Sequence, residues 1–184
     1  MTKEAKCVTI YTDGACLGNP GPGGYAVVLL YGDHRKELSG GFRLTTSNRM
    51  EIMAAIVGLH ALKHRCEIKL HTDSKYLQQS ISLGWAQRWR SKGWKKKNVR
   101  RLNWDLWERL LDACAQHDVE FIWVRGHAGN TENERCDRLS VQAAQGKDLP
   151  VDALYEEPLP LPQEPAPPSL FDFATEGGHP RPKR

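Results

Sequence analysis

The sequence predicts an α/β fold in which a five-stranded mixed sheet is flanked by helices. Up to about residue 45 the chain shows three strand patterns, each with alternating apolar and polar residues, separated by turn residues. After that, helix patterns alternate with strand patterns. Two of the strand patterns end on an aspartate followed by a turn residue. With 184 residues, 40% of them hydrophobic, the chain can build one domain with a real core plus an appendage, which leaves no room for a second enzyme.

The first three strands are expected over residues 8–12, 25–31 and 37–43. The stretch 18–24, Gly-Asn-Pro-Gly-Pro-Gly-Gly, is rich in turn-forming residues and is predicted as the loop between the first two strands. Because no helix pattern interrupts these elements, an antiparallel meander is expected to open the fold.

Helices and strands alternate in the rest of the folded part. Residues 47–64, rich in Met, Ala, Ile and Leu, predict a long helix that leads into a strand at 67–72. Thr131 and Glu134 have the spacing of a capping box, so a last helix is expected from about 132 to 145. Between these come helical pieces at 74–83, within the basic segment 84–103 and at 102–117, and a fifth strand at 119–124.

The composition changes at Lys147. Nine of the eleven prolines follow it, and from Asp148 to Glu176 there are seven acids and no Lys or Arg. Such a stretch does not bury enough apolar surface to fold alone. We therefore expect a domain over 1–146 and a Pro-rich, acidic, disordered tail over 147–184.

The cysteines and the apolar runs restrict the class of protein. An odd number of cysteines without Cys-x-x-Cys spacing indicates neither a disulfide framework nor a zinc site, so reduced and mostly buried thiols are expected. No apolar run approaches the roughly 18 residues of a membrane span, and the start of the chain lacks a signal-peptide core. A cytoplasmic protein is expected. The cysteines are Cys7, Cys16, Cys66, Cys114 and Cys136.

Two aspartates stand at the ends of predicted strands, Asp13 after 8–12 and Asp73 after 67–72. If these strands are neighbours, the two carboxylates converge at a sheet edge where α/β proteins place their ligands. Two such charges about 4 Å apart repel by roughly 4 kcal/mol at an effective dielectric near 20. A proton or a cation must offset this repulsion, so a divalent metal site is the first hypothesis.

Two further carboxylates lie where the helix pattern expects small or apolar residues. Glu51 shares a stripe with Ala55 and Leu62, and Asp137 shares one with Val141. The alternative is that both sit at a solvent edge or near a helix N-terminus. Together with the two strand-end aspartates they form a set of oxygen ligands suited to Mg²⁺ or Mn²⁺. Two such ions act as a clamp for in-line phosphoryl transfer, which needs no covalent nucleophile.

Four separated motifs, in order, closely resemble those of bacterial ribonuclease HI, a type 1 ribonuclease H. They are Tyr11 to Gly24, Thr45 to Glu51, Thr72 to Tyr76, and Gly126 to Asp137. The resemblance covers about residues 6–145. It implies a ribonuclease H-like fold with a basic helical protrusion. It also implies an endonuclease that cuts the RNA strand of RNA–DNA hybrids and leaves 5′-phosphate and 3′-hydroxyl ends.

The resemblance also implies residue roles. Asp13, Glu51, Asp73 and Asp137 match the ligands of two Mg²⁺ ions, with Mn²⁺ as an alternative, and His127 matches the catalytic histidine. Hydroxyl and amide side chains that line the minor groove distinguish a ribose 2′-hydroxyl from deoxyribose. By the resemblance, the positions that line the minor groove and a phosphate are Cys16, Asn19, Thr46, Ser47, Asn48 and Arg49.

Two positions depart from the commonest bacterial pattern. Ser47 stands where asparagine is frequent, which shortens the reach toward a base edge. Lys75 stands where glutamine is frequent and either touches a phosphate or is a solvated surface residue. His71, inside an apolar strand, is expected to be structural.

Charge is unevenly distributed along the chain. The net charge is +4, but residues 84–103 contribute +8 and leave −4 on the remainder. A local polyanion contact is therefore expected. By the resemblance, this segment grips the DNA strand of the hybrid, with strong salt dependence. The alternative is a packed tryptophan cluster with a solvated charged rim, and Trp104 and Trp107 are expected in the core. The candidate contacts are Trp85, Arg88, Trp89, Trp94, Lys95, Lys96 and Lys97.

Other interpretations remain open from the sequence. One is a catalytically silent module that binds hybrids, and another is a transposase or integrase of similar fold. A monomer that binds RNA–DNA hybrid and no membrane is expected. The island Pro168 to Phe173 in the tail contains Ser-Leu-Phe, which faintly resembles peptides that dock on bacterial sliding clamps, or it is an incidental apolar patch.

Overall fold

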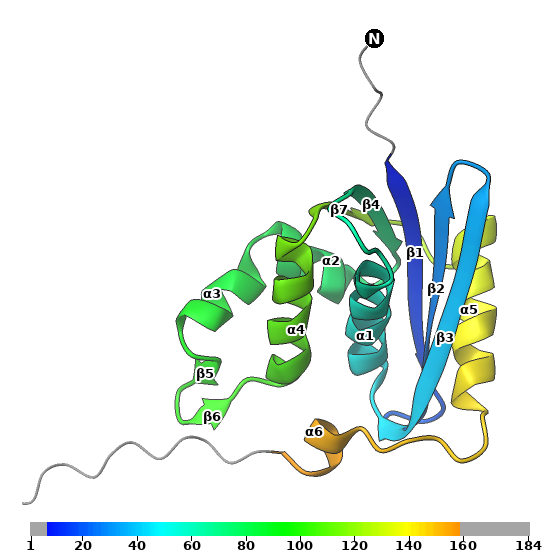
Figure 1. Cartoon of the computed structure of the whole chain (residues 1–184). Coiled ribbons are helices and arrows are strands. Elements are labelled where there is room, and N and C mark those ends of the chain that lie inside the picture. Colours follow the sequence, from blue (N-terminus) through cyan, green and yellow to red (C-terminus); the bar gives the residue numbers. More distant parts are fainter. Residues whose placement is uncertain (1–6, 159–184) are drawn as a thin grey trace, which may run out of the picture.

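The centre of the molecule is one five-stranded sheet with the strand order β3-β2-β1-β4-β7. Figure 1 shows the computed structural model of the chain, in which residues 7–158 are described. β1, β2 and β3 form an antiparallel meander, β4 runs parallel to β1, and β7 runs parallel to β4. The predicted mixed sheet is confirmed. Its strands are β1 (Val8–Cys16), β2 (Gly21–Tyr31), β3 (His34–Thr45), β4 (Glu67–Thr72) and β7 (Asp118–Trp123).

The register of the two central parallel strands sets the position of the site. Thr12 of β1 is paired with Thr72 of β4. The residues that follow, Asp13 and Asp73, are therefore at the same level in neighbouring chain segments. This is the convergence that the two strand ends predicted.

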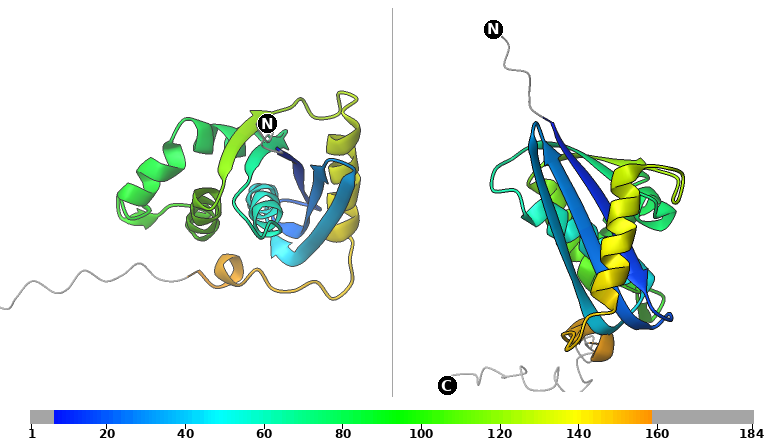
Figure 2. Two further views of the ribbon diagram at one scale, coloured as in Figure 1. Left: turned by 45° about the horizontal axis from the view of Figure 1, so that its top comes forward. Right: turned by 90° about the vertical axis from the view of Figure 1, so that its right-hand side faces the viewer.

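Helices cover both faces of the sheet (Figure 2). α5 packs on β1, β2 and β3, while α1 packs on β1 and β2 from the other face and α4 packs against α1. None of the helices within residues 7–158 combines the length and apolar character needed to cross a membrane. The helices are α1 (Ser47–His60), α2 (Lys75–Ser82), α3 (Trp85–Ser91), α4 (Trp104–Ala115), α5 (Thr131–Ala144) and α6 (Ala153–Glu156).

The glycine-rich stretch after β1 is only partly a loop. β1 extends to Cys16 and β2 begins at Gly21, so the second half of the predicted loop 18–24 belongs to a strand. At Gly24 a Cβ atom would lie 2.1 Å from the Ser140 carbonyl oxygen. Glycine is needed there so that α5 can approach β2. In the sequence alone, a glycine that serves packing cannot be distinguished from one that serves a turn.

The basic segment was predicted to be helical, but only its first part forms a helix. After α3 the chain forms a two-stranded antiparallel hairpin of β5 (Lys95–Lys96) and β6 (Val99–Arg100). Trp94 and Lys97 have φ angles of 60° and 57°, which a right-handed helix excludes. We call α3 together with this hairpin, residues 85–100, the basic protrusion.

Residues 147–158, which we call the C-terminal strap, correct the prediction that a disordered tail starts at 147. The Arg43 amide donates a hydrogen bond to the Pro150 carbonyl at 2.9 Å, and Asp152 is only 5% exposed. The composition indicated too little apolar surface for folding, but the strap attaches through a backbone hydrogen bond and ion pairs. The rest of the predicted tail, including Pro168 to Phe173, lies outside the described residues.

Candidate active site

Three of the four predicted carboxylates meet in one place, which we call the acidic pocket: Asp13, Glu51 and Asp73. Each offers a carboxylate oxygen, and these oxygens all lie within 4.8 Å of one another. Asp13 comes from β1, Asp73 follows β4, and Glu51 lies near the start of α1. Gly14 permits the close approach of α1, because a Cβ atom there would lie 2.3 Å from the Glu51 amide nitrogen.

The acidic pocket is electrostatically strained. Burial, with the nearby Asp73 carboxylate, raises the pKa of Asp13 to about 6. Burial and the charges of Asp13 and Asp73 also raise the pKa of Glu51 well above its usual range. The Glu51 Oε2 atom is buried and has no hydrogen-bond partner. A buried carboxylate oxygen without a partner is costly unless something else offsets its charge.

The donor set of the acidic pocket fits a hard divalent cation. All of its ligand atoms are carboxylate oxygens, the type that Mg²⁺ and Mn²⁺ prefer. A cation there would supply the partner that Glu51 Oε2 lacks. This group of carboxylates could therefore hold a metal ion.

Asp137 and His127 stand at the rim of the acidic pocket. The Asp137 carboxylate, whose side chain is 38% exposed, is close enough to contribute to the raised pKa of Asp13. His127 Nδ1 lies 4.0 Å from Asp137 Oδ2, and the His127 side chain is 79% exposed. His127 also has a left-handed φ of 52°. Asp137 is thus near the acidic pocket but outside its tight group, and the histidine projects into solvent.

Two further residues of α5 contact the acidic pocket and were not predicted. The Ser140 hydroxyl donates to Asp13 Oδ2 at 2.8 Å, and Asn133 Nδ2 donates to Asp73 Oδ2 at 3.3 Å. Asn133 lies four residues before Asp137 and Ser140 three residues after it, so all three share a helix face. This spacing would have found both. α5 begins at Thr131 with Asn130 as its N-cap, whose Oδ1 accepts from two backbone amides, so the predicted cap at Thr131 was one residue late.

A polar turn, Thr46, Ser47 and Asn48, begins α1 beside the glycine-rich loop. Thr46 is the N-cap, and its Oγ1 accepts from the Arg49 amide at 3.4 Å. The Ser47 amide donates to Asn19 Oδ1 at 3.1 Å. These contacts bring together the side chains that the resemblance places in the minor groove. Nearby, the Cys16 thiol donates to the carbonyls of Gly21 and Thr45.

Arg49 does not lie where its predicted phosphate contact requires. It is 2% exposed, and its guanidinium donates to Asp105 at 2.7 and 2.9 Å and to Asp152 at 2.7 and 2.8 Å. Both carboxylates come from elements distant in sequence, α4 and the C-terminal strap. The structure therefore assigns Arg49 a structural role in a buried ion cluster.

Lys75 and His71 both contact aromatic rings. Lys75 Nζ lies 4.8 Å from the centre of the Trp123 ring, and Trp123 Nε1 donates to the Asp73 carbonyl at 3.0 Å. Lys75 is thus held beside the acidic pocket by a cation–π contact. His71 is stacked on Tyr11 at 4.6 Å, and burial lowers its pKa. The stacking agrees with the structural role expected of His71.

The basic protrusion combines packed indoles with exposed cations. Trp94 is 7% exposed and donates from Nε1 to Glu108, while Trp89 packs edge-on against the fully buried Trp107. Arg101 lies 4.2 Å above the Trp89 ring. Trp89 and Trp94 therefore hold the protrusion together, as the alternative interpretation expected. Trp85 is half-buried, and the exposed cations of the set are Arg88, Lys95, Lys96 and Lys97.

The fold and the acidic pocket define an α/β protein whose cluster of carboxylate oxygens could hold divalent cations, an arrangement suited to phosphodiester hydrolysis. A family model, RNase H, matches residues 5–145. The chain belongs to the ribonuclease H family.

Curated relatives agree with this assignment. A ribonuclease H of Syntrophus aciditrophicus is 66% identical over 152 residues, covering 82% of this chain and 87% of that protein. One of Rippkaea orientalis is 60% identical, covering 85% of this chain and 96% of that protein. The resemblance to bacterial ribonuclease H, and the expectation of an enzyme of that family rather than a transposase or integrase, are confirmed.

Solved structures of the same fold include LC9-RNase H1, described as a type 1 RNase H with the type 2 active-site motif. It is 33% identical with a TM-score of 0.71, covering 79% of this chain and 75% of that one. RNase H1 of Halobacterium salinarum is 26% identical with a TM-score of 0.56, covering 76% and 98%. The predicted ribonuclease H-like fold is confirmed.

Proposed function

We propose that this protein is an endonuclease that hydrolyses the RNA strand of RNA–DNA hybrids with two Mg²⁺ ions and leaves 5′-phosphate and 3′-hydroxyl ends. The observation that carries the proposal is the acidic pocket, in which Glu51 keeps a buried oxygen without a partner. The family match, and the name ribonuclease H borne by the relatives, support the reaction class.

The carboxylates proposed to hold the ions are Asp13, Glu51, Asp73 and Asp137. When bound, a pair of divalent cations lowers the pKa of an attacking water and offsets charge on the leaving oxygen. The chain prepares this site through α5. Hydrogen bonds from Ser140 to Asp13 and from Asn133 to Asp73 fix the orientation of two ligands before any cation arrives.

His127 is proposed to move a proton at the imidazole ring during cleavage or product departure. Its ring is largely exposed, so it exchanges protons with solvent, and its Nδ1 faces the Asp137 carboxylate at 4.0 Å. The loop passes close to the acidic pocket before the histidine and is hydrogen-bonded to α5 after it. A Cβ at Gly126 would lie 2.7 Å from Asp73 Oδ2, and the Gly129 amide donates to Glu134 at 3.1 Å.

Two surfaces are proposed to bind the hybrid. The polar turn with Asn19 faces the minor groove, where its hydroxyl and amide groups read ribose 2′-hydroxyls. The exposed cations of the basic protrusion bind phosphates of the DNA strand. Lys75 is proposed to contact a phosphate next to the acidic pocket, because Trp123 holds its ammonium group there.

The cleavage test compares labelled RNA–DNA hybrid, double-stranded RNA and double-stranded DNA, with and without Mg²⁺. We expect cuts only in the RNA of the hybrid, with 5′-phosphate ends, and none after chelation. Cleavage that persists in the chelator would contradict the metal proposal.

Asp13→Asn separates the enzyme from the alternative of a silent binding module. Loss of a pocket ligand should lower kcat by about 10⁴-fold, because bound metal supplies several kcal/mol of transition-state stabilisation. Hybrid affinity, measured by fluorescence anisotropy, should change little. A wild-type chain that binds hybrid as tightly as the variant and cleaves no faster would favour the silent module.

Replacement of Lys95, Lys96 and Lys97 together by Ala tests the basic protrusion. The apparent KM for hybrid should rise, and the slope of log K against log salt should flatten by roughly 0.9 for each lost phosphate contact. The matched control replaces Lys36, Lys63 and Lys69, three exposed lysines outside the protrusion. Equal slopes in the two variants would remove this role.

Finer features of the proposal have their own tests. We propose a catalytic domain over 1–146 supported by the C-terminal strap, and a cytoplasmic monomer, to be checked by cell fractionation and by light scattering. Docking of the tail on a replication protein is tested with a peptide spanning 166–175 in a pull-down with purified sliding clamp. No retention of the clamp would discard that idea.

A further inference from the structure

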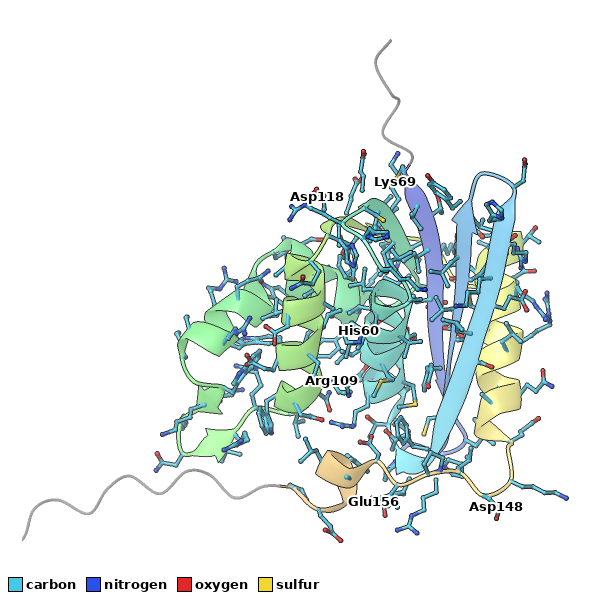
Figure 3. The ribbon with its side chains drawn as sticks, in the orientation of Figure 1. His60, Lys69, Arg109, Asp118, Asp148 and Glu156 are labelled. Atoms are coloured by element: carbon cyan, nitrogen blue, oxygen red, sulfur yellow. The ribbon has the colours of Figure 1, made fainter. Side chains whose placement is uncertain are left out.

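The C-terminal strap lies beyond residues 5–145, which the family model matches, yet it reaches the polar turn. Figure 3 labels Asp148 and Glu156 on this part of the chain, and Figure 1 shows it passing the end of β3 and the start of α1. Two ties fix it to β3: the Arg43 amide donates to Pro150, and the Arg43 side chain pairs with Glu156 at 2.8 Å.

One strap residue, Asp152, binds the residues on both sides of the polar turn. Its Oδ2 accepts from the Thr45 hydroxyl at 2.7 Å and from Arg49 Nε at 2.7 Å, and its Oδ1 accepts from Arg49 Nη2 at 2.8 Å. Thr45 immediately precedes the turn and Arg49 immediately follows it. Thr45 is fully buried and Asp152 is 5% exposed, so water does not compete strongly for these bonds.

Asp105 provides an internal comparison. It accepts two hydrogen bonds from Arg49, at 2.7 and 2.9 Å, and is 7% exposed. It therefore resembles Asp152 as an ionic partner of Arg49. Among the contacts of the described residues, however, the Thr45 hydroxyl is bound to Asp152 and not to Asp105. A purely stabilising effect should be shared by both aspartates, whereas an effect on the turn should be specific to Asp152.

We infer that Asp152 is a positioning residue for substrate recognition: it joins Thr45 and Arg49 so that the polar turn presents Thr46, Ser47 and Asn48 to the ribose 2′-hydroxyls. The inference rests on the proposed function, because it assigns the turn to hybrid binding. Among the contacts within residues 7–158, the side chain of Asp152 is bound to Thr45 and Arg49 and to none of the acidic-pocket carboxylates, so its loss should affect substrate binding more than the chemical step. The strap is then a working part of the binding surface.

The test uses paired variants of the full chain at a temperature where circular dichroism shows each to be folded. Thr45→Val removes the hydroxyl and should raise KM for hybrid about fivefold with kcat within about twofold, and Thr45→Ser, which keeps the hydroxyl, should restore KM. Asp152→Asn should raise KM by about tenfold. Asp105→Asn should lower Tm as much as Asp152→Asn does, while KM stays within about twofold of wild type.

Two results would overturn the inference: equal KM values for the Val and Ser variants of Thr45, or equal KM increases for the Asn variants of Asp105 and Asp152. Failure of the proposed function has a different signature, since wild type itself would then not cleave hybrid. In that case the same variants are compared by hybrid Kd in chelator. A Kd that follows the presence of the Thr45 hydroxyl supports the inference, and an unchanged Kd rejects it.

Discussion

Two groups of buried carboxylates lie on either side of the first turns of α1, and only one of them is neutralised. Arg49 joins Asp105 and Asp152, and every oxygen of those two carboxylates accepts a hydrogen bond from its guanidinium. Two residues later, Glu51 faces Asp13, and its Oε2 has no partner. The first turns of α1 thus contribute to one cluster whose carboxylate oxygens all have hydrogen-bond partners and to another in which the Glu51 Oε2 atom has none.

The difference separates stabilising charge from functional charge. In the Arg49 cluster the protein supplies its own counter-charge, so desolvation is offset within the fold. In the acidic pocket, burial and the neighbouring carboxylates raise the pKa of Asp13 and of Glu51, which reduces stability unless a proton or a cation is present. The buried Glu51 oxygen that the fold leaves without a partner therefore marks a place where an external cation could bind.

The largest expected effect on stability comes from breaking the satisfied cluster. Arg49→Met leaves two buried carboxylates without a counter-charge and should lower the free energy of unfolding by about 3–5 kcal/mol. Arg43→Met is the control, because Arg43 pairs with Glu156 at the surface with its side chain 60% exposed, and should cost less than about 1 kcal/mol. Urea denaturation measures both. Similar losses for the two variants would remove the distinction.

Removing one charge from the acidic pocket should raise the free energy of unfolding, whereas breaking the Arg49 cluster lowers it. In chelator near neutral pH, Asp13→Asn should stabilise the fold by about 2 kcal/mol, because a charge that is buried and is repelled by Asp73 disappears. The control is Asp118→Asn, which removes an exposed carboxylate paired with Arg65 and should destabilise slightly. A destabilised Asp13 variant would show that the pocket is not strained.

The pH dependence of the metal-free protein should show a smaller effect of the same origin. The folded pKa of Asp13, about 6, lies above its ordinary value of 3.8, so its stabilising contribution is full below about pH 4 and is lost as pH rises through 6. From about pH 5.5 to 7.5 this costs roughly 1 kcal/mol. The decline, followed by thermal unfolding in chelator, should be absent in Asp13→Asn and should be reversed by added Mg²⁺. A decline that is unchanged in the variant would assign it to another group.

The acidic pocket was largely readable from the sequence. The strand patterns before Asp13 and Asp73 and the position of Glu51 on an apolar helix stripe indicate convergence, because strand and helix periodicity are local patterns. β1 in fact continues past Asp13 to Cys16. The partners of these carboxylates were harder to find. Helix spacing places Ser140 on the same face as Asp137, but its hydrogen bond to Asp13 depends on the packing of α5 against β1.

Long-range ion pairs account for what the sequence did not predict. Arg49 was a candidate substrate contact only because it matches a family motif, and motif matching does not reveal distant ion-pair partners. Its partners Asp105 and Asp152 are 56 and 103 residues away, and the second lies in a stretch whose composition indicated disorder. The hairpin after α3 was not predicted for a different reason. Lysine rarely adopts a positive φ, so the turn at Lys97 has no signal in the sequence.

The indole of Trp123, a fluorescent group, contacts both the Asp73 segment of the acidic pocket and the side chain of Lys75. Its Nε1 is bonded to the main chain of Asp73, and its face carries the ammonium of Lys75. Under the proposed function, cations entering the acidic pocket would change the surroundings of the first contact, and a phosphate bound by Lys75 would change the second. The part of the fluorescence emission that is lost in Trp123→Phe would therefore report cation binding and substrate binding as two separate changes.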